Sequence, residues 1–244
     1  GSQITGRSII MDTTEREILI IRLRLIDLIK SFFIEKPDAE LLSRWRGTFS
    51  ALSKEQISPL LDKAVRDLSR QLNDKSLEAI QDEYYTLFVD PFGEQLVNLM
   101  ASHYFDGRNY GETLVQIREI FSATHVVKDS DVKEPEDSLV VMFDMLGTLV
   151  EMEKEGEQTA AAQQQLVVDY LVPFLEKLGP EISTNSAADF YGAVVQFIVA
   201  YLDLEKLTFP VIIRNWYAGD RFSPLGLGGT QSVRKFLAGR EKDH

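Results

Sequence analysis

Apolar residues recur at helical spacing along most of this chain, and this periodicity constrains the fold more than any other feature. From Asp12 to about Leu207 they repeat every three or four residues in one segment after another, which is the pattern of amphipathic α-helices. The same stretch has no convincing alternation of apolar and polar residues. The sequence therefore predicts an all-α fold, a single helical bundle of about eight to ten helices with a long irregular loop and a short glycine-rich basic tail.

Capping residues and prolines divide this region into helices. Asp38 and Ser58 are expected N-caps, Pro59 suits a first helical position, and Pro173 is expected to kink the helix that contains it. The predicted helices span about 13–35, 38–52, 59–72, 74–88, 111–124, 138–154, 159–178 and 186–206. The predicted core face of the third helix consists of Leu60, Leu61, Ala64, Leu68 and Leu72.

Two stretches interrupt the helical pattern. Residues 89–111 contain Pro91, Gly93, Gly107 and Gly111, which predict a long connection. Long ordered loops within compact domains are uncommon and often functional. Residues 125–137 are polar and rich in acidic side chains, and they predict a second loop.

Charge and composition divide the chain into three parts. Residues 1–10 precede Met11 and look like an added leader outside the fold, and residues 11–210 form the expected all-helical domain. Residues 211–244 carry six basic and three acidic side chains and five glycines, which indicates a basic, glycine-rich tail that is either a separate module or disordered. The formal net charge of the whole chain is −12, which disfavours general nucleic-acid binding and favours a basic peptide partner.

The sequence indicates a binding protein and not an enzyme, with no cofactor and no metal. It has no cysteine, which excludes disulfides and thiolate chemistry. No nucleophile elbow, phosphate-binding glycine loop or helical metal-ligand pair is present. Asp129 and Asp131 resemble the opening of a calcium loop, but the required glycine and closing glutamate are missing. No stretch reaches the length of a membrane span and no secretory signal is visible, so a cytoplasmic location without membrane insertion is expected.

Aromatic residues gather around the first predicted loop. Tyr84 and Phe88 fit the core face of the preceding helix. Phe92 lies between Pro91 and Gly93 in the loop itself, where a large apolar ring is a natural anchor for a partner.

At these residues the sequence resembles the TorD/DmsD/NarJ family of chaperones for complex redox enzymes. Residues 83–92, EYYTLFVDPF, are similar to the family's signature of E-Y-x-x-L-F-x-G-P followed by an aromatic residue. Four later segments also resemble family motifs, in the same order and at suitable intervals. They are Ser102-His103-Tyr104 with Gly107, Glu134-Pro135-Glu136-Asp137, Tyr170-Leu171-Val172-Pro173-Phe174, and Phe190-Tyr191.

The resemblance implies an all-helical chaperone without catalytic activity. It implies binding of the twin-arginine signal peptide, or of the apo form, of a molybdopterin-containing oxidoreductase, which is held in the cytoplasm until its cofactor is inserted. The protein itself is expected to be a monomer or a homodimer. The candidate peptide-binding residues that match the family motifs are Phe92, Tyr104, Pro135, Glu136, Asp137 and Ser138.

The chain departs from the family pattern at two positions. Asp90 stands where the family usually has glycine, and Ser138 stands where it usually has histidine. Because that histidine is implicated in peptide binding in the family, the role of Ser138 remains open. A serine at this point also fits the N-cap of the following helix equally well.

The basic tail has a separate resemblance. The segment 219–226, GDRFSPLG, with Ile213-Arg214 before it and Gly229 and Lys235-Phe236 after it, looks like the C-terminal segment of tRNA(Ile)-lysidine synthetases. The ATP-binding S-G-G-x-D-S loop of those enzymes is absent, so lysidine synthesis is not predicted. The tail still leaves a second hypothesis open, an RNA-associated helical module that binds nucleic acid through residues 211–244. A third hypothesis, a helical enzyme, requires a buried acid–base group that the sequence does not display.

Overall fold

The computed structural model describes residues 13–218, and within this range it confirms the all-α bundle. The elements are α1 (Thr13–Ser31), α2 (Ala39–Leu52), α3 (Pro59–Asp74), α4 (Leu77–Phe88), α5 (Ala101–Asp106), α6 (Glu112–Ala123), α7 (Leu139–Lys154), α8 (Ala160–Gln165), the π-helical segment η1 (Leu166–Leu171), α9 (Val172–Thr184) and α10 (Phe190–Ala218). No strand occurs within residues 13–218, where Met100 and Ser138 form an isolated antiparallel bridge.

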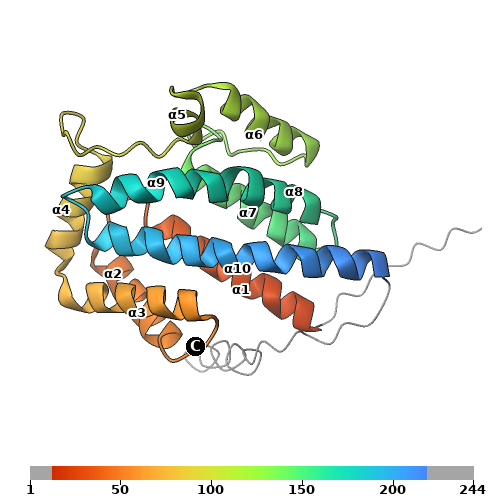
Figure 1. The fold of residues 1–244 in the computed structure, drawn as a ribbon, viewed down its shortest axis with the longest axis horizontal. Coiled ribbons are helices and arrows are strands. Elements are labelled where there is room, and N and C mark those ends of the chain that lie inside the picture. Colours follow the sequence, from red (N-terminus) through yellow and green to blue (C-terminus); the bar gives the residue numbers. More distant parts are fainter. Residues whose placement is uncertain (1–12, 219–244) are drawn as a thin grey trace, which may run out of the picture.

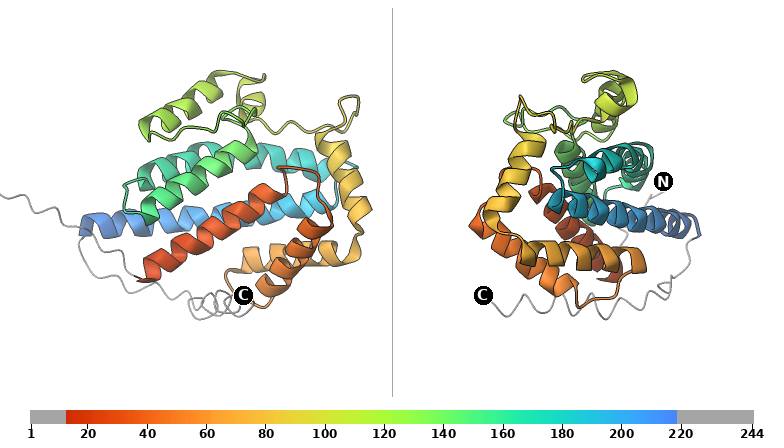
Figure 2. Two further views of the ribbon diagram at one scale, coloured as in Figure 1. Left: turned by 180° about the vertical axis from the view of Figure 1, so that it is seen from behind. Right: turned by 60° about the vertical axis from the view of Figure 1, so that its left-hand side comes forward.

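The helices pack in layers around the long helix α10 (Figure 1). Helices α9 and α3 contact α10, and α1 packs against α7. Helix α2 pairs with α3 on one side of the molecule, while α5 and α6 form a separate layer on the opposite side, against α9. The views in Figure 2 show that α4 stands across one end of the bundle, between these two sides.

Aromatic rings fill the junction between α1, α2 and α10. The ring of Phe32, just after α1, lies 4.6 Å from that of Trp45 on α2. The ring of Trp45 stacks 5.9 Å from that of Phe190 at the start of α10. Because Trp45 is fully buried, its indole N–H needs a partner, and it donates to the Ser31 hydroxyl at 2.8 Å.

Side-chain caps begin four of the helices. The capping oxygen in each case accepts a hydrogen bond from the backbone N–H three residues further along the chain. This satisfies one of the amides that a helix N-terminus leaves unpaired. The capping residues are Asp38, Ser58, Ser76 and Ser138. The predicted caps Asp38 and Ser58 are thus confirmed.

Several predicted helix ends are wrong because tertiary packing shifts them. Helix α1 ends at Ser31 and not near residue 35, since the amide of Phe33 donates to Lys30 in a tightened turn and the Phe33 ring is buried. Helix α4 begins at Leu77 and not at residues 73–74, because α3 continues to Asp74.

One predicted core residue is also wrong. Leu60 is 50% exposed, whereas Val65 is buried and takes its place on the inner face of α3. Leu60 lies on the outer face of α3, because the buried face of this helix is set by Leu61, Ala64, Val65, Leu68 and Leu72 at helical spacing.

The predicted kink at Pro173 takes the form of a change of helix type. Proline has no amide proton, so the carbonyl of Asp169 loses its usual helical partner. The chain adopts the π-helical segment η1 over 166–171 directly before this proline, between α8 and α9. The single helix expected over 159–178 is therefore three consecutive segments.

Helix α10 crosses the expected boundary of the basic tail. It runs from Phe190 to Ala218, so the predicted division between residues 210 and 211 falls within it. The expected leader, residues 1–10, and the larger part of the tail, residues 219–244, lie outside the described residues.

Candidate functional site

The segment that resembles the first family motif, residues 83–92, begins with a buried carboxylate. Glu83 lies on α4, and its two oxygens accept hydrogen bonds from the backbone amides of Asp189, Phe190 and Tyr191 at 2.7–3.1 Å. These are the free amides at the start of α10, where a negative charge is favourable. Glu83 therefore holds α4 against α10 and does not face a partner.

The exposed residues of this region form an apolar surface that we call the aromatic loop surface. It consists of Tyr85, Val89, Phe92 and Leu96, which are all exposed and lie on the end of α4 and the loop after it. Tyr85 lies in the last turn of α4, and Val89 is the residue that follows the end of this helix as its C-cap. Phe92 is 93% exposed, which is unusual for a large apolar ring and typical of an interaction site.

Local hydrogen bonds give the aromatic loop a defined shape. The Asp90 carboxylate accepts from the Phe92 amide at 3.1 Å, and its oxygen lies 3.0 Å from where a side chain on Gly93 would begin. The amide of Val97 then donates to the carbonyl of Leu87 at 2.8 Å and returns the chain to the body of the protein. Asp90, which replaces the family's glycine, thus forms the turn that presents Phe92.

Beyond this loop, the expected long connection contains the short helix α5, and the second loop packs against it. The amide of Ala101 donates to the carbonyl of Asp137, and the amide of Leu139 donates to the carbonyl of Leu99, both at 2.9 Å. The Asp137 carboxylate accepts from the amide of Ser102 at 2.9 Å. These bonds join two segments that lie more than thirty residues apart in the sequence, a contact that no local pattern indicates.

Asp137 and Ser138 are both buried in this arrangement. Asp137 is fully buried, and its second oxygen, Oδ1, has no hydrogen-bond partner among the described residues. The Ser138 hydroxyl accepts from the amide of Val141 at 3.3 Å as the N-cap of α7. In this conformation neither side chain is presented to a partner, and capping is the interaction that Ser138 makes.

Tyr104 lies half-buried between α5 and α9. Its hydroxyl donates to the carbonyl of Asn98 at 2.9 Å, and its ring is 5.5 Å from that of Phe174. Burial raises the pKa of the Tyr104 hydroxyl far above its ordinary value, and the nearby Glu181 raises it further. The hydroxyl therefore stays protonated and acts as a hydrogen-bond donor.

Pro135 and Glu136 are partly exposed and lie in the loop before α7. The Glu136 carboxylate accepts from the Arg118 guanidinium on α6 at 2.9 Å, and the carbonyl of Pro135 accepts from the amide of Ser138 at 3.0 Å. The loop is thus tied to α6 on one side and to α7 on the other.

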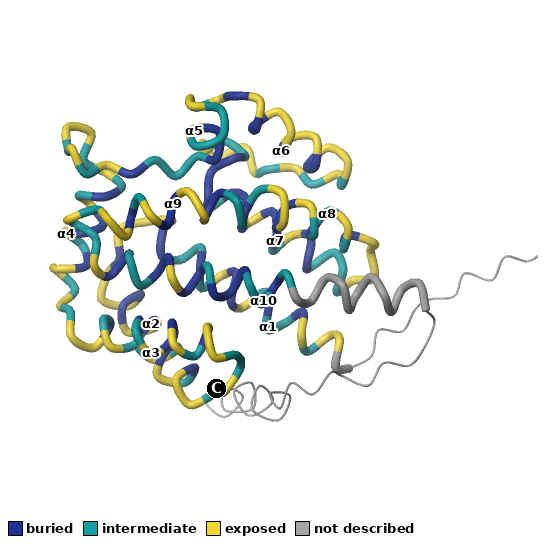
Figure 3. The backbone as a smooth tube through the Cα atoms, in the orientation of Figure 1, coloured by how far each residue is buried: buried dark blue, intermediate teal, exposed yellow. Residues whose placement is uncertain are grey.

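The structure brings five of the six predicted site residues together around α5 and places the sixth apart. Tyr104 lies on α5, and Asp137, with its chain neighbours on either side, bonds the first two residues of that helix. Phe92 lies in the preceding loop, nine residues before Ala101. Figure 3 shows this preceding loop as a mainly exposed segment at the end of the bundle above α4.

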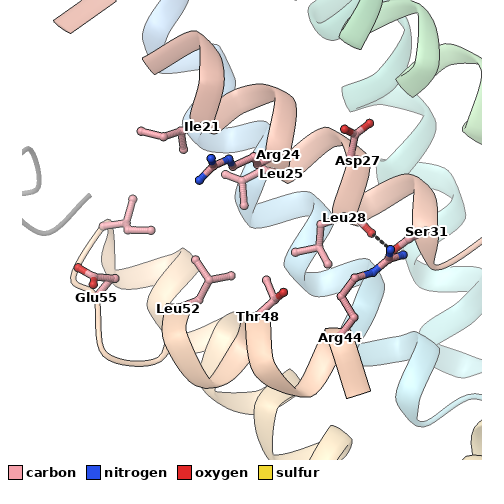
Figure 4. Close-up of a pocket in the computed structure, with 11 residues that line it drawn as sticks. Ile21, Arg24, Leu25, Asp27, Leu28, Ser31, Arg44, Thr48, Leu52 and Glu55 are labelled. Carbon is pink, nitrogen blue, oxygen red and sulfur yellow. Dashed lines mark hydrogen bonds between the residues drawn. The ribbon is translucent and has the colours of Figure 1, made fainter. Parts of the chain in front are cut away.

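An open pocket lies elsewhere, at a place that no sequence motif indicates. It has a volume of about 270 Å³, lies between α1 and α2, and is lined by Leu25, Leu28 and Leu52 among others (Figure 4). Neither Phe92 nor Asp137 lines it. The only signal was the apolar stripe of the first helix, which is equally well explained by core packing.

The described residues offer no arrangement for metal binding. Within residues 13–218 no group of three metal-binding side chains occurs, and Asp129 accepts the amide of Asp131 in a local turn. In the same range no helix is long and apolar enough to span a bilayer.

The chain is similar in sequence to one protein family and to several chaperone proteins named TorD. The sequence profile of the family described as nitrate reductase delta subunit matches residues 54–179, just over half of the chain. The chaperone protein TorD of Aliivibrio salmonicida is 28% identical over 160 residues, covering 61% of this chain and 74% of that protein. TorD of Vibrio cholerae strain M66-2 is 24% identical over 204 residues, covering 77% of this chain and 91% of that protein.

Among solved structures, a protein from Archaeoglobus fulgidus described as a redox enzyme maturation protein is similar with a TM-score of 0.49 and 16% identity, covering 81% of this chain and 99% of that one. The family assignment rests on the sequence profile and on the order of the motifs in the chain. The chain belongs to the nitrate reductase delta subunit family, together with the TorD/DmsD/NarJ chaperones that serve the maturation of redox enzymes.

Proposed function

We propose that this chaperone binds the twin-arginine signal peptide, or the apo form, of a molybdopterin-containing oxidoreductase and holds it in the cytoplasm until the cofactor is inserted. The proposal rests on the family membership and on the exposure of the aromatic loop surface. It assigns the protein a binding role and no catalytic step.

The observation that carries this proposal is the exposed ring of Phe92 within an apolar surface. Four large apolar side chains are exposed within twelve residues, from Tyr85 to Leu96. A signal peptide contains an apolar segment that becomes helical, and such a segment buries its face against an apolar surface. Contact with Phe92 would remove the most exposed large apolar side chain of the described residues from water.

Acidic side chains surround the same surface. Asp82 and Glu94 are exposed, and Asp90 is partly exposed, on either side of Tyr85 and Phe92. A twin-arginine leader carries its positive charge next to its apolar segment, so the two ends of the leader meet complementary parts of this surface. The net charge of −12 adds a long-range attraction for a basic peptide.

Asp137 gives the second loop a role in this proposal. Its Oδ1 atom is buried without a partner among the described residues, a state that costs free energy. If the loop 134–138 opens when a leader binds, this oxygen can accept a hydrogen bond from the peptide. The family's peptide-binding motif would then act by rearrangement, and Ser138 would remain the cap of α7.

The proposal predicts that a labelled twin-arginine leader peptide binds the full chain with micromolar or tighter affinity. Phe92→Ala should weaken binding by more than about 1 kcal/mol, roughly fivefold, because it removes the exposed anchor. Val127→Ala is the matched control, since Val127 is 88% exposed in a different loop. Fluorescence anisotropy measures all three affinities.

A leader with two lysines in place of the arginines tests the recognition of the charged segment. Absence of saturable binding across several twin-arginine leaders would contradict the proposal. Equal loss of affinity in Phe92→Ala and Val127→Ala would show that the aromatic loop surface is not the binding site.

A further inference from the structure

The pocket between α1 and α2 is an open groove that follows two helices. One wall is a single face of α1, from Ile21 to Ser31, and the other is a face of α2 from Arg44 to Leu52, continued by Glu55 and Ile57 (Figure 4). The ten-residue span on α1 corresponds to about 15 Å at 1.5 Å per residue. This length matches about three turns of an additional helix laid between the two.

The floor of the groove is apolar. Leu25 and Leu52 lie deepest, and Ile21, Leu28 and Ile57 are half-buried beside them. The volume of about 270 Å³ compares with ~150 Å³ for a cavity left by one large apolar side chain. The groove thus has room for about two such side chains from a partner.

Two arginines at the edges of the groove lack ionic partners within the described residues. Arg24 on α1 and Arg44 on α2 are both exposed, and neither forms an ion pair or a side-chain hydrogen bond in that part of the chain. Asp27 between them is already paired with Lys30 at 3.1 Å. One carboxylate of the rim, Glu55 after the end of α2, forms no ion pair within residues 13–218, so the two arginines face a single unpaired acidic side chain. Two free cations beside an apolar floor are notable in a chain of net charge −12.

The spacing of these arginines restricts the occupant. Arg44 lines the groove together with Ser31, whereas Arg24 is seven residues earlier on α1. Seven helical residues correspond to about 10 Å, or two turns. Carboxylates two turns apart on a bound helix would therefore reach both arginines at once.

We propose that this groove, which we call the arginine groove, binds an acidic amphipathic helix of a partner protein. The helix inserts apolar side chains one turn apart between α1 and α2 and places carboxylates beside Arg24 and Arg44. The basic leader peptide and the basic tail of this chain are both disfavoured here, because each brings positive charge to the arginines. The groove is a second binding surface, separate from the aromatic loop surface.

The test uses the full chain and a designed probe. The probe is a fluorescein-labelled amphipathic peptide of four turns with leucines on one face and glutamates two turns apart at its edge. We expect saturable binding by anisotropy, and we expect a peptide with lysines at the glutamate positions to bind about tenfold more weakly.

Charge-reversed and groove-filling variants locate the binding site. The double variant Arg24→Glu/Arg44→Glu should weaken the glutamate peptide about tenfold and strengthen the lysine peptide. Thr48→Trp, which fills the groove with an indole, should weaken both peptides. Circular dichroism checks that each variant keeps its helical content.

The outcomes separate this inference from the proposed function. If the Arg24→Glu/Arg44→Glu variant still binds the twin-arginine leader, the two surfaces are independent. If this variant no longer binds the leader, the assignment of two separate surfaces is overturned. The proposal is also overturned if the glutamate probe does not bind, or if it binds both variants like the unmodified chain. A self-association that the double variant abolishes would assign the groove to a second copy instead.

Discussion

Glu83 shows how a single residue of a family motif can serve the fold. It is buried on α4 and accepts from three amides at the start of α10, 106–108 residues further along the chain. Two helices that are distant in sequence are thereby fixed at the end of the bundle that presents Phe92. The carboxylate is the single acceptor that satisfies these three amides at once.

Replacing this carboxylate should destabilise the whole protein. Glu83→Ala leaves buried amides unpaired, and we expect the free energy of unfolding to fall by about 3 kcal/mol. Urea unfolding measures this change. The control is Glu78→Ala on the exposed side of the same helix, which should change the free energy of unfolding by less than about 0.5 kcal/mol. Equal effects of the two substitutions would contradict the role assigned to Glu83.

For single residues, the sequence predicted the positions of the motif residues better than it predicted their contacts and burial. Phe92 was expected to be exposed because proline and glycine flank it, and it is. The capping of α10 by Glu83 and the burial of Asp137 depend on contacts across long stretches of chain, which periodicity does not report. Asp137 was therefore expected to be accessible to a peptide, whereas it is buried in the protein.

The arrangement of the helices depends on a buried polar contact between α1 and α10. The Arg22 guanidinium donates to Glu205 at 2.7 Å and to Gln163 at 2.8 Å, and the Tyr201 hydroxyl also donates to Glu205. All four side chains are buried. Burial alone would lower the pKa of Arg22, but Glu205 beside it more than compensates and keeps the guanidinium charged.

Removing one member of a buried ion pair lowers the free energy of unfolding strongly, because the other charge stays buried. Arg22→Met should lower the free energy of unfolding by about 3–5 kcal/mol, because Glu205 loses its charged partner. The double variant Arg22→Met/Glu205→Met should recover a large part of that loss, since apolar replacements of both members pack without a buried charge. Thermal unfolding of the single and double variants checks this. If the two losses simply add, the residues do not act as a pair.

The sequence predicted where the long helices are. It did not predict the residues at which they end, or that one segment is π-helical and not α-helical. Each strongly periodic segment is helical, because an apolar face repeated every three or four residues can be buried only in that form. The end of α1 at Ser31 and the π-helical segment before Pro173 reflect packing of Phe33 and the missing amide of proline. The groove between α1 and α2 was not predicted, since an apolar stripe does not reveal whether a neighbour covers it completely.

At the scale of the whole molecule, we propose two separate binding surfaces that prefer partners of opposite charge. The aromatic loop surface is fringed by Asp82 and Glu94, and the arginine groove lies between α1 and α2. In Figure 1 the loop that follows α4 rises above that helix, whereas α2 lies below α9 and α10. A partner with a basic apolar leader and an acidic helix could engage both, and the two affinities would then reinforce each other.

The most direct test of the central claim is site-specific photo-crosslinking in the native cell. Phe92 is replaced by p-benzoylphenylalanine, with the same replacement at Val127 as the matched exposed control. The account predicts that the probe at position 92 crosslinks to the signal peptide of an apo molybdopterin oxidoreductase, and that deleting this signal peptide abolishes the product. A probe at position 92 that gives no more product than the probe at position 127, or that crosslinks equally without the signal peptide, would contradict it.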